Sequence, residues 1–334
     1  MIPLNNQPKT LIDPMGRSIT YLRVSLTAKC NLRCSYCYGT GKDNSISSDH
    51  LSTTDVIRLI EVFASLGINK IRFTGGEPLM RRDIVDLVRR TAKMEGINQI
   101  GLTTNGLVLE PLLPSLIEAG LNCLNISLDT LKRETFRQIT GSDGFDRVYS
   151  AIISAEECGT FKRVKVNTVV MRGINDEEVR QFTLWALERR IDLRFIEFMP
   201  TQQSGWDKSR LVNEDMIKDL IGLDLEPVKG NDNSPGPASS YTLPGAPGRI
   251  SFISTISHNF CGRCNRLRLT STGQLVGCLF LNQPADLKKM LAEVDDIKDI
   301  AEQIRDIVAR PGFRRPPQEL PVIGFNPFMR KVGG

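Results

Sequence analysis

The sequence lacks the features that mark membrane, secreted and nucleic-acid-binding proteins. It has no run of 18 or more apolar residues, so we expect no membrane span. Residues 1–20 carry no basic patch followed by an apolar stretch, which argues against a signal peptide. The net charge is only +5, and no basic block resembles a nucleic-acid-binding arm. We therefore expect a cytoplasmic protein that binds neither membranes nor nucleic acids.

Histidine is scarce, and the cysteines are unevenly placed. The two histidines are His50 and His258, and six of the eight cysteines fall into two groups of three. Cys123 and Cys158 stand apart, and we interpret them as core thiols. Disulfides are not expected in a reducing compartment, so the grouped thiols indicate metal or redox chemistry.

Strand-like and helix-like segments alternate through the first two thirds of the chain. This order predicts a parallel sheet with crossover helices, and six repeats are too few for a complete eight-stranded barrel. We therefore predict an α/β fold, a partial (β/α)6 TIM-like barrel with its chemistry at the carboxyl ends of the strands. The predicted strands are 21–27, 70–74, 99–104, 123–128, 163–170 and 194–199. The predicted helices are 55–66, 82–93, 112–118, 132–158 with a break at 141–144, and 175–188 with Asn175 as its cap.

The rest of the chain has a different character. Residues 230–248 are rich in Gly, Pro, Ser and Asn, which predicts a long loop. Strands at 249–256 and 266–270 and a helix at 294–308 are expected after it, in an extension that packs on the barrel. We predict three parts: an N-terminal segment 1–20, the barrel 21–229 and a C-terminal region 230–334.

The first group of cysteines directly follows the first predicted strand. Cys30, Cys34 and Cys37 have Cys-x3-Cys-x2-Cys spacing, and three thiolates on one tight loop can bind three irons of a 4Fe–4S cluster. The fourth iron would stay open to a ligand or substrate. A structural zinc site is the alternative, and it needs a fourth ligand, for which His50 is the nearby candidate.

Polar residues and glycines follow the other predicted strands. Gly75 and Gly76 would let the backbone approach a ligand closely. Thr103, Ser127 and Met199 lie at the ends of the third, fourth and sixth strands. Each has an ordinary structural explanation on its own, as a turn, a loop cap or a core residue.

The second group of cysteines encloses Arg266 and Arg268 in the sequence. Cys261, Cys264 and Cys278 have Cys-x2-Cys-x13-Cys spacing, again one thiolate short of a saturated cluster. Zinc completed by His258 is the alternative. Arg266 and Arg268 follow in a predicted strand, where residues two apart face the same side. Such forked guanidinium donors suit phosphate oxygens.

Together these motifs resemble the radical S-adenosylmethionine superfamily, and within it the GTP 3′,8-cyclase family of molybdenum cofactor synthesis. The first resemblance rests on the Cys-x3-Cys-x-aromatic-Cys loop after a first strand. The second rests on the run from residue 260 to 270, on the run from 194 to 200 and on the terminal Gly333-Gly334. It covers the chain from about residue 15 to 334.

The resemblance implies two 4Fe–4S clusters, S-adenosylmethionine as cofactor and GTP as substrate. Cys30, Cys34 and Cys37 would hold the first cluster, and Cys261, Cys264 and Cys278 the second. The implied contacts of S-adenosylmethionine are Tyr36, Gly76, Ser127 and Met199. The implied contacts of GTP are Arg23, Arg72, Thr103, Lys165, Arg266, Leu267 and Arg268, of which Arg266 and Arg268 would also be catalytic.

The resemblance also implies a reaction and partners. A 5′-deoxyadenosyl radical would remove the ribose 3′ hydrogen, and C3′ would attack C8 of guanine. An electron and a proton would complete (8S)-3′,8-cyclo-7,8-dihydroguanosine 5′-triphosphate. A reducing electron donor, a homodimer and a downstream cyclic pyranopterin monophosphate synthase are expected, and the Gly-Gly tail would reach into the active site.

Departures from the family and two alternatives remain. Tyr38-Gly39 replaces Met-Pro after the third cysteine, Ser251 replaces a common glycine, and residues 329–332 before the terminal glycines are atypical. One alternative is a radical enzyme that modifies peptides, although its auxiliary domains usually carry more cysteines. The other is an electron carrier or a zinc-structural protein, although carriers normally bind their clusters through four cysteines.

Overall fold

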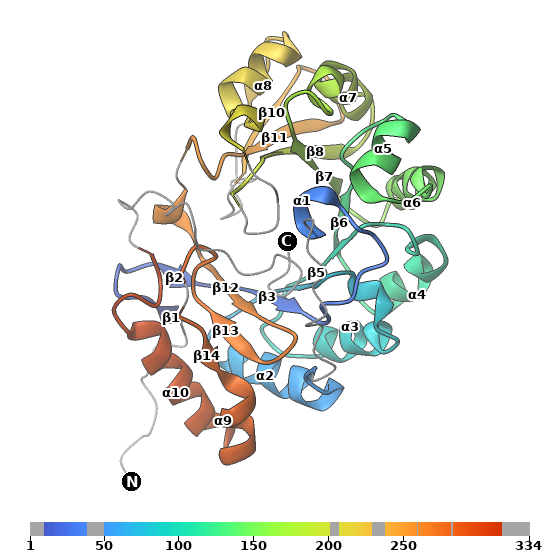
Figure 1. The fold of residues 1–334 in the computed structure, drawn as a ribbon. Helices are drawn as coiled ribbons and strands as arrows, with labels where there is room; N and C mark the ends of the chain where they lie inside the picture. Colours follow the sequence, from blue (N-terminus) through green and yellow to red (C-terminus); the bar gives the residue numbers. More distant parts are fainter. Residues whose placement is uncertain are drawn as a thin grey trace.

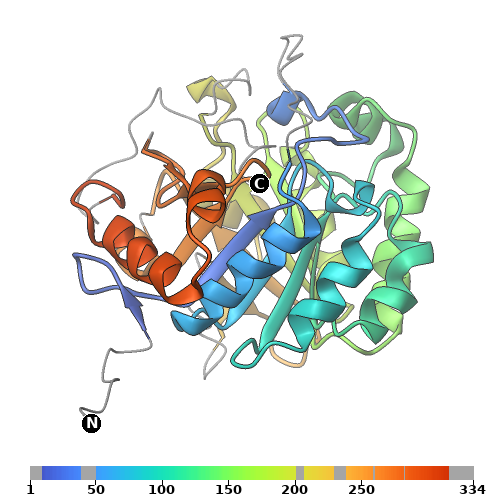
Figure 2. The same cartoon turned by 90° about the horizontal axis from the view of Figure 1, so that it is seen from below.

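The computed structural model of the protein describes residues 10–38, 50–200, 207–228, 238–258, 260–281 and 283–315. Within these ranges, twelve strands form one curved sheet in the order β14-β13-β12-β3-β4-β5-β6-β7-β8-β11-β10-β9 (Figure 1). The helices between residues 53 and 157 stand side by side along the outer face of this sheet (Figure 2). None of the helices in the described ranges has both the length and the apolar character that a membrane crossing requires.

The eight central strands of the sheet are parallel. They are, in spatial order, β12 (Arg266–Leu269), β3 (Tyr21–Ser25), β4 (Lys70–Thr74), β5 (Gln99–Thr104), β6 (Cys123–Ser127), β7 (Val164–Val170), β8 (Ile191–Glu197) and β11 (Arg249–Ile253). Antiparallel strands extend both edges: β13 (Gln274–Val276) and β14 (Ala285–Asp286) beyond β12, and β10 (Ser239–Thr242) and β9 (Glu226–Pro227) beyond β11. A separate hairpin of β1 (Leu11–Ile12) and β2 (Ser18–Ile19) precedes the sheet.

Helices cover the sheet because each presents an apolar face to it. In α2 (Thr53–Ser65), Val56, Leu59, Ile60 and Phe63 are buried, and Ser52 caps the helix start in a capping box with Asp55. The other helices are α1 (Ser35–Tyr38), α3 (Ile84–Ala92), α4 (Leu113–Glu118), α5 (Arg133–Thr140), α6 (Phe145–Glu157), α7 (Val179–Leu187), α8 (Glu214–Ile221), α9 (Leu287–Glu293) and α10 (Ile297–Ala309), with short 3-10 turns η1 (Pro78–Met80), η2 (Glu110–Leu112), η3 (Asp176–Glu178), η4 (Lys208–Arg210) and η5 (Cys261–Arg263).

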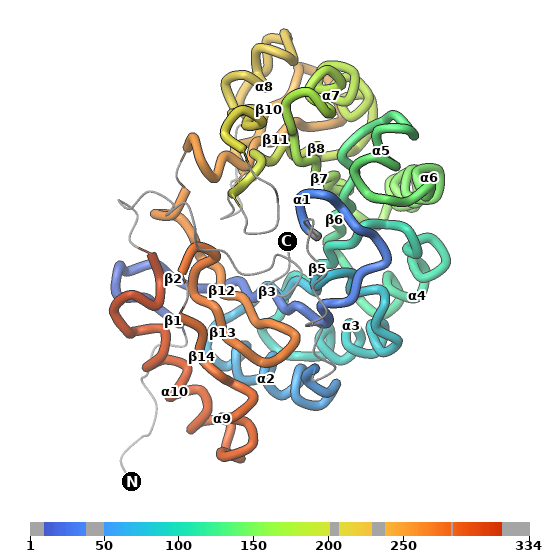
Figure 3. The backbone as a smooth tube through the Cα atoms, in the orientation of Figure 1, coloured from blue at the N-terminus to red at the C-terminus, as the bar shows by residue number. Residues whose placement is uncertain are grey.

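The predicted partial α/β barrel is confirmed, and so are its six strands, of which β4 and β5 match at both ends. The C-terminal region differs from the prediction. It does not merely pack on the barrel, because β11 pairs with β8 and β12 pairs with β3, so both edges of the parallel sheet come from residues after 248. Residues 230–248 are not wholly loop, since β10 lies among them. The trace in Figure 3 shows the open side between these two edges.

Asn175 stands at the expected cap position, but it precedes a 3-10 turn, η3, and its side chain does not cap the helix α7 that follows. Its amide instead donates to the carbonyl oxygens of Asp129 and Val169, at 2.7 and 2.8 Å, and its oxygen accepts from the Met171 amide. Asn175 therefore connects the ends of β6 and β7, where buried carbonyls need donors more than an exposed helix start does.

We expect Phe252→Ala to lower the free energy of unfolding of the whole barrel by about 3 kcal/mol. Phe252 on β11 is buried and stacks on Phe195 of β8, with ring centroids 6.3 Å apart, so its loss opens a cavity inside the shared sheet. Urea unfolding followed by far-UV circular dichroism measures the change. Leu220→Ala, at a side chain that is 42% exposed, is the matched control. An early transition confined to the C-terminal region would contradict a single sheet.

Candidate active site

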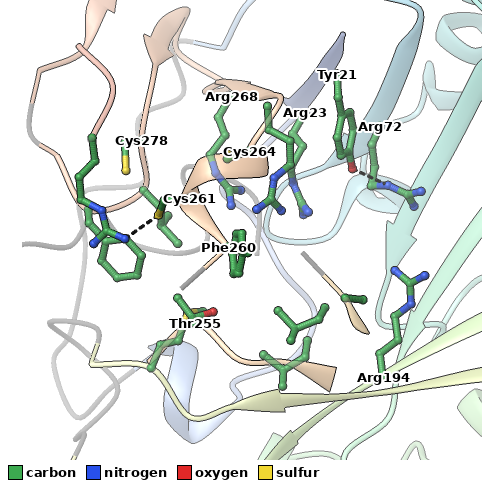
Figure 4. Close-up of a pocket in the computed structure, with 18 of the residues that line it drawn as sticks. Tyr21, Arg23, Arg72, Arg194, Thr255, Phe260, Cys261, Cys264, Arg268 and Cys278 are labelled. Carbon is green, nitrogen blue, oxygen red and sulfur yellow. Dashed lines mark hydrogen bonds between the residues drawn. The ribbon is translucent and has the colours of Figure 1, made fainter. Parts of the chain in front are cut away.

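The inner face of the sheet encloses a pocket lined by many cations and by the second group of cysteines. The lining residues that the structure describes include no aspartate or glutamate. Figure 4 shows the arginines of several strands pointing into the same space as Cys261, Cys264 and Cys278. Ten cationic residues line the pocket: Arg17, Arg23, Lys70, Arg72, Lys165, Arg194, Arg266, Arg268, Arg314 and Arg315.

Strand register brings the cations together. Arg268 of β12 lies beside Arg23 of β3, which lies beside Arg72 of β4. Since alternate residues of a strand face opposite sides, Arg266 joins Arg268 on the pocket side. Leu267 is fully buried in the core on the other side, so only its backbone faces a ligand in the pocket.

Arg72 is held by its neighbours on three sides. Its Nε donates to the Tyr21 hydroxyl at 2.8 Å, and its Nη1 donates to the Leu102 carbonyl at 3.0 Å and to Asn125 Oδ1 at 2.9 Å. Gly101 lies under the guanidinium, where a Cβ atom would come within 2.7 Å of Arg72 Cζ. The absence of a side chain at residue 101 is therefore what makes room for Arg72.

The crowding of like charges shifts the pKa values of the pocket. Burial first, and then Arg194 and Arg72, lower the pKa of Lys165 to about 7. Burial is also the main cause that lowers the pKa of Arg23 to about 10. The pKa of the buried Arg268 is lowered as well, by burial and then by Arg23. These shifts mean that the pocket favours an anionic ligand strongly.

The same cations also lower the pKa of Tyr21, where they favour the charged phenolate instead of a neutral group. Burial raises the pKa of this phenol, but four surrounding cations outweigh burial and lower the pKa to about 7. In order of effect the cations are Arg72, Arg23, Lys70 and Arg266. A partly ionised tyrosine thus supplies negative charge within the wall of the pocket.

In the first group of cysteines, Cys30 and Cys34 lie on the loop between β3 and α1, and Cys37 lies within α1. Burial raises the pKa of the Cys34 thiol, and the nearby Asp129 carboxylate and the other two thiols raise it further. Hydrogen-bond donors face the first sulfur: the Leu32 amide lies 3.4 Å and Asn105 Nδ2 3.7 Å from Cys30 Sγ. Cys30 and Cys37 therefore lie close to Cys34, whose setting favours the neutral thiol.

Gly75, Gly76 and Glu77 hold that cysteine loop. The Gly76 amide donates to the Thr27 carbonyl at 2.7 Å, and the Glu77 amide to the Lys29 carbonyl at 2.8 Å. A side chain at Gly76 would collide with the backbone of Lys29. Burial raises the pKa of Glu77 to about 7, although its carboxylate accepts hydrogen bonds from the Asn105 and Leu79 amides.

In the second group of cysteines, Cys261 and Cys264 lie between β11 and β12, and Cys278 follows β13. Burial raises the pKa of Cys264, but Arg266 and Arg314 outweigh it and lower the pKa to about 6. Burial raises the pKa of Cys278, and Cys261 and Cys264 are among the nearby groups that act on it. Arg315 Nη2 lies 2.7 Å from Cys261 Sγ. The three thiols share one cationic environment.

A single metal ion fits these sites poorly. In the described ranges, no three side chains of His, Cys, Asp or Glu converge as ligands of one ion. His258 pairs with Glu214, at 3.5 Å, and is not among the residues that line the pocket. A 4Fe–4S cluster makes a different demand, because each thiolate binds its own iron.

Comparison with known proteins agrees with this architecture. The family model described as Radical SAM superfamily matches residues 24–186, and the one described as Molybdenum Cofactor Synthesis C matches residues 191–315. A protein named GTP 3′,8-cyclase from Thermodesulfovibrio yellowstonii is 42% identical over 297 residues, which cover 87% of this chain and 91% of that protein. The chain belongs to the GTP 3′,8-cyclase family.

Other relatives extend the comparison. A GTP 3′,8-cyclase from Geobacter sulfurreducens is 42% identical over 89% of this chain and 91% of its own length. The mouse protein named Molybdenum cofactor biosynthesis protein 1 is 45% identical, and the match covers 84% of this chain but 44% of the mouse protein. The chain thus spans less than half of that relative. The fold is shared with the crystal structure of Streptococcus suis SuiB bound to precursor peptide SuiA. The TM-score is 0.56, and the sequences are 16% identical over 86% of this chain and 66% of that chain.

The residues that the GTP 3′,8-cyclase family implies fall into two neighbourhoods. Arg23, Arg72, Lys165, Arg266, Arg268 and Met199 line the pocket. Thr103 lies on β5 in register with the lining residue Asn125. Tyr36 and Gly76 lie at the first cysteine loop, where the Tyr36 hydroxyl donates to Asp129 at 2.8 Å, and Ser127 ends β6. Their contacts with GTP and S-adenosylmethionine stay predictions.

Some predicted features lie elsewhere. Gly39, residues 329–332 and Gly333-Gly334 are outside the described residues. Cys158 is exposed, so its interpretation as a core thiol is wrong, and Cys123 is only half-buried. Ser251 is fully buried and donates to Asp192 Oδ1 at 2.6 Å. This hydrogen bond explains how a serine fits where the family commonly has glycine.

Sequence reasoning missed several lining residues of this GTP 3′,8-cyclase family member. Tyr21 and Lys70 precede Arg23 and Arg72 by two positions, so strand alternation alone would have placed them on the same side. No such signal existed for Arg17, Arg314 and Arg315, because they reach the pocket only through the packing of both chain ends.

We expect the Tyr21 phenol to ionise near pH 7 in the ligand-free, cluster-free chain. Four cations stabilise its phenolate, whereas an ordinary tyrosine has a pKa near 10. NMR of 13Cζ-labelled tyrosine will resolve the five tyrosines, and the early titration should vanish in Tyr21→Phe but persist in Tyr241→Phe. Five resonances that all titrate near or above pH 10 would contradict the described electrostatics.

Proposed function

We propose that the protein cyclises GTP to (8S)-3′,8-cyclo-7,8-dihydroguanosine 5′-triphosphate, the first step of molybdenum cofactor synthesis. The observation that carries this proposal is a pocket with ten cations, no carboxylate among its described lining residues and three cysteines in its wall. Relatives named GTP 3′,8-cyclase, of which the match covers 91%, support the same substrate. A neutral peptide would add no negative charge to a pocket lined by ten cations, which disfavours a peptide substrate.

The residues present fit two iron–sulfur clusters and S-adenosylmethionine. Cys30, Cys34 and Cys37 would hold one cluster, and Cys261, Cys264 and Cys278 the other, each with one iron not bound by the protein. S-adenosylmethionine would contact Tyr36, Gly76, Ser127 and Met199. When bound, these groups supply the carbon radical that starts the reaction and an open iron beside the substrate.

The chain itself binds, orients and neutralises the substrate. Arg23, Arg72 and Lys165 offer charge-assisted donors to the triphosphate. Arg266 and Arg268 project from β12 beside Cys264, so they face the part of GTP closest to the second cysteine group. Tyr21 holds a proton on its hydroxyl that the surrounding cations make easy to release.

The proposal includes partners and an arrangement of the chain. Radical formation requires a reducing electron donor, and the product would pass to a cyclic pyranopterin monophosphate synthase. A homodimer and a cytoplasmic location are part of the same proposal. We also propose a division into a segment 1–20, a barrel 21–229 and a region 230–334 that carries the second cluster and the tail. Strands β11 and β12 of this last region pair with strands of the barrel.

We expect the anaerobically reconstituted protein to hold about eight irons per chain and to form 5′-deoxyadenosine and the cyclised triphosphate from GTP. Liquid chromatography with mass spectrometry measures both products. Cys261→Ser should lower iron to about four per chain and abolish cyclisation. Cys158→Ser is the matched control, because that thiol is exposed and outside both groups. The proposal would be contradicted if the protein bound stoichiometric zinc and no iron. It would also be contradicted if 5′-deoxyadenosine formed at the same rate with and without GTP and no cyclised product appeared.

We expect GTP binding at pH 8 to take up about one proton. Lys165 has a pKa of about 7 in the ligand-free pocket because burial and then Arg194 disfavour its charge, and a triphosphate raises that pKa. The pKa of Tyr21, also about 7, rises too when the ligand neutralises its cations. Affinity should therefore fall as pH rises above 7.

Calorimetry in two buffers of different ionisation enthalpy measures this uptake. At pH 8 the terminal phosphate is already ionised, so its own titration does not interfere. Lys165→Gln should reduce the uptake, and Lys289→Gln, at an exposed position on α9, should not. If GTP binding released protons at pH 8 instead, it would contradict the expectation that the ligand raises the pKa values of Lys165 and Tyr21.

A further inference from the structure

Asp13, Arg17 and Arg314 form a buried charged network behind the second cysteine group. Asp13 lies in the turn between β1 and β2, and Arg314 follows α10, so the network joins the two ends of the described chain. Asp13 Oδ2 pairs with Arg17 Nε at 2.6 Å and with Arg314 Nε at 2.8 Å. Asp13 Oδ1 accepts from the Arg17 and Met15 amides at 2.9 and 3.0 Å. All three side chains are more than 90% buried.

The two arginines use their remaining donors on the backbone of the cysteine segment. Arg17 Nη1 donates to the Cys261 carbonyl at 2.7 Å. Arg314 Nη1 donates to the Arg266 carbonyl at 2.7 Å, and its Nη2 donates to the Cys264 carbonyl. One carboxylate thus orients two guanidinium groups, which together bond three carbonyls between residues 261 and 266.

That segment has little regular structure to define its shape. Cys261–Arg263 is a single 3-10 turn, and β12 begins only at Arg266. The short turn by itself leaves most carbonyl groups of the segment without helix or strand partners. Side chains from distant parts of the chain therefore fix the path of the backbone that carries Cys261 and Cys264.

We propose that Asp13, Arg17 and Arg314 are positioning residues for the second cluster, because they hold the Cys261–Arg266 backbone so that both thiolates face the pocket. The inference rests on the proposed function for the cluster itself. One carboxylate compensates two guanidinium groups, so the network carries a net positive charge beside the thiolates.

Asp13→Asn keeps the shape of the side chain and removes its charge, which leaves both arginines without a counter-ion. In the reconstituted full chain, iron should fall from about eight to about four per molecule. The electron paramagnetic resonance change caused by GTP should be lost, while cleavage of S-adenosylmethionine without GTP should stay within about twofold. Iron analysis and spectroscopy of the reduced protein measure these effects.

Arg58→Gln is the matched control. Arg58 of α2 also donates to carbonyls of the C-terminal region, those of Leu291, Val294 and Asp295, but far from the cysteines in sequence and outside the pocket lining. This variant should keep about eight irons. If it loses iron as Asp13→Asn does, general loosening of the C-terminal region explains the loss and the inference is wrong.

A second readout does not depend on metal. In the cluster-free full chain, alkylation by iodoacetamide, resolved for each cysteine by mass spectrometry, should be on the order of tenfold faster at Cys261 and Cys264 in Asp13→Asn. Alkylation of Cys30, Cys34 and Cys37 should not change. Should Asp13→Asn fail to fold, Arg17→Gln removes the bond to the Cys261 carbonyl while Asp13 keeps its pair with Arg314.

The outcomes separate this inference from the proposed function. Eight irons and unchanged alkylation in Asp13→Asn would overturn the inference and leave the proposed function standing. If the unmodified protein held only four irons, the proposed second cluster would be wrong, and Asp13, Arg17 and Arg314 could not be positioning residues for it. Faster alkylation confined to Cys261 and Cys264, with iron lost from the same site, supports the inference.

Discussion

The mutual repulsion of buried cations is the constraint on which the rest of the site depends. Ten lysine and arginine side chains line one pocket, and its described lining residues include no carboxylate. Carboxylates outside the lining pair with three of the ten: Asp13 with Arg17 and Arg314, and Asp192 with Arg194. Taking charges out of water is costly, and burial, the largest cause of the lowered pKa values of Lys165 and Arg23, records that cost. The proposed function accounts for this cost, because a bound triphosphate would restore the balance of charge, and affinity and selectivity for it would then have the same origin.

The sheet converts this constraint into geometry. Eight parallel strands place alternate residues on the inner face, so one cation on each of several strands becomes a row. The strand order of the sheet also explains how the C-terminal region contributes to the pocket. Its strands β11 and β12 lie at opposite edges of the parallel sheet, and the chain between them carries Cys261 and Cys264 across the open side. The second cysteine group therefore faces the pocket as a consequence of strand order.

Much of the barrel and of the site was predictable because its signals are local. The spacing of Cys30, Cys34 and Cys37, the helix periodicity of α2 and the alternation of Arg266 and Arg268 each depend on a few adjacent residues. The pairing of β11 and β12 with the barrel was not predictable, since nothing in the two segments states which strand they join. Arg17, Arg314 and Arg315 were missed for the same reason. Their place in the pocket depends on contacts between segments far apart in the sequence. Asn175 shows that even a typical cap residue can donate its hydrogen bonds to nearby buried carbonyls instead of capping a helix.

The affinity of the reconstituted protein for GTP compared with guanosine tests the central claim most directly. Both ligands offer the same base and ribose, and only GTP carries the charge that the cations require. Calorimetry should show GTP binding at least about a thousandfold more tightly, a difference of about 4 kcal/mol. Affinities within about tenfold of each other would contradict the account, because the buried cations would then contribute little to recognition.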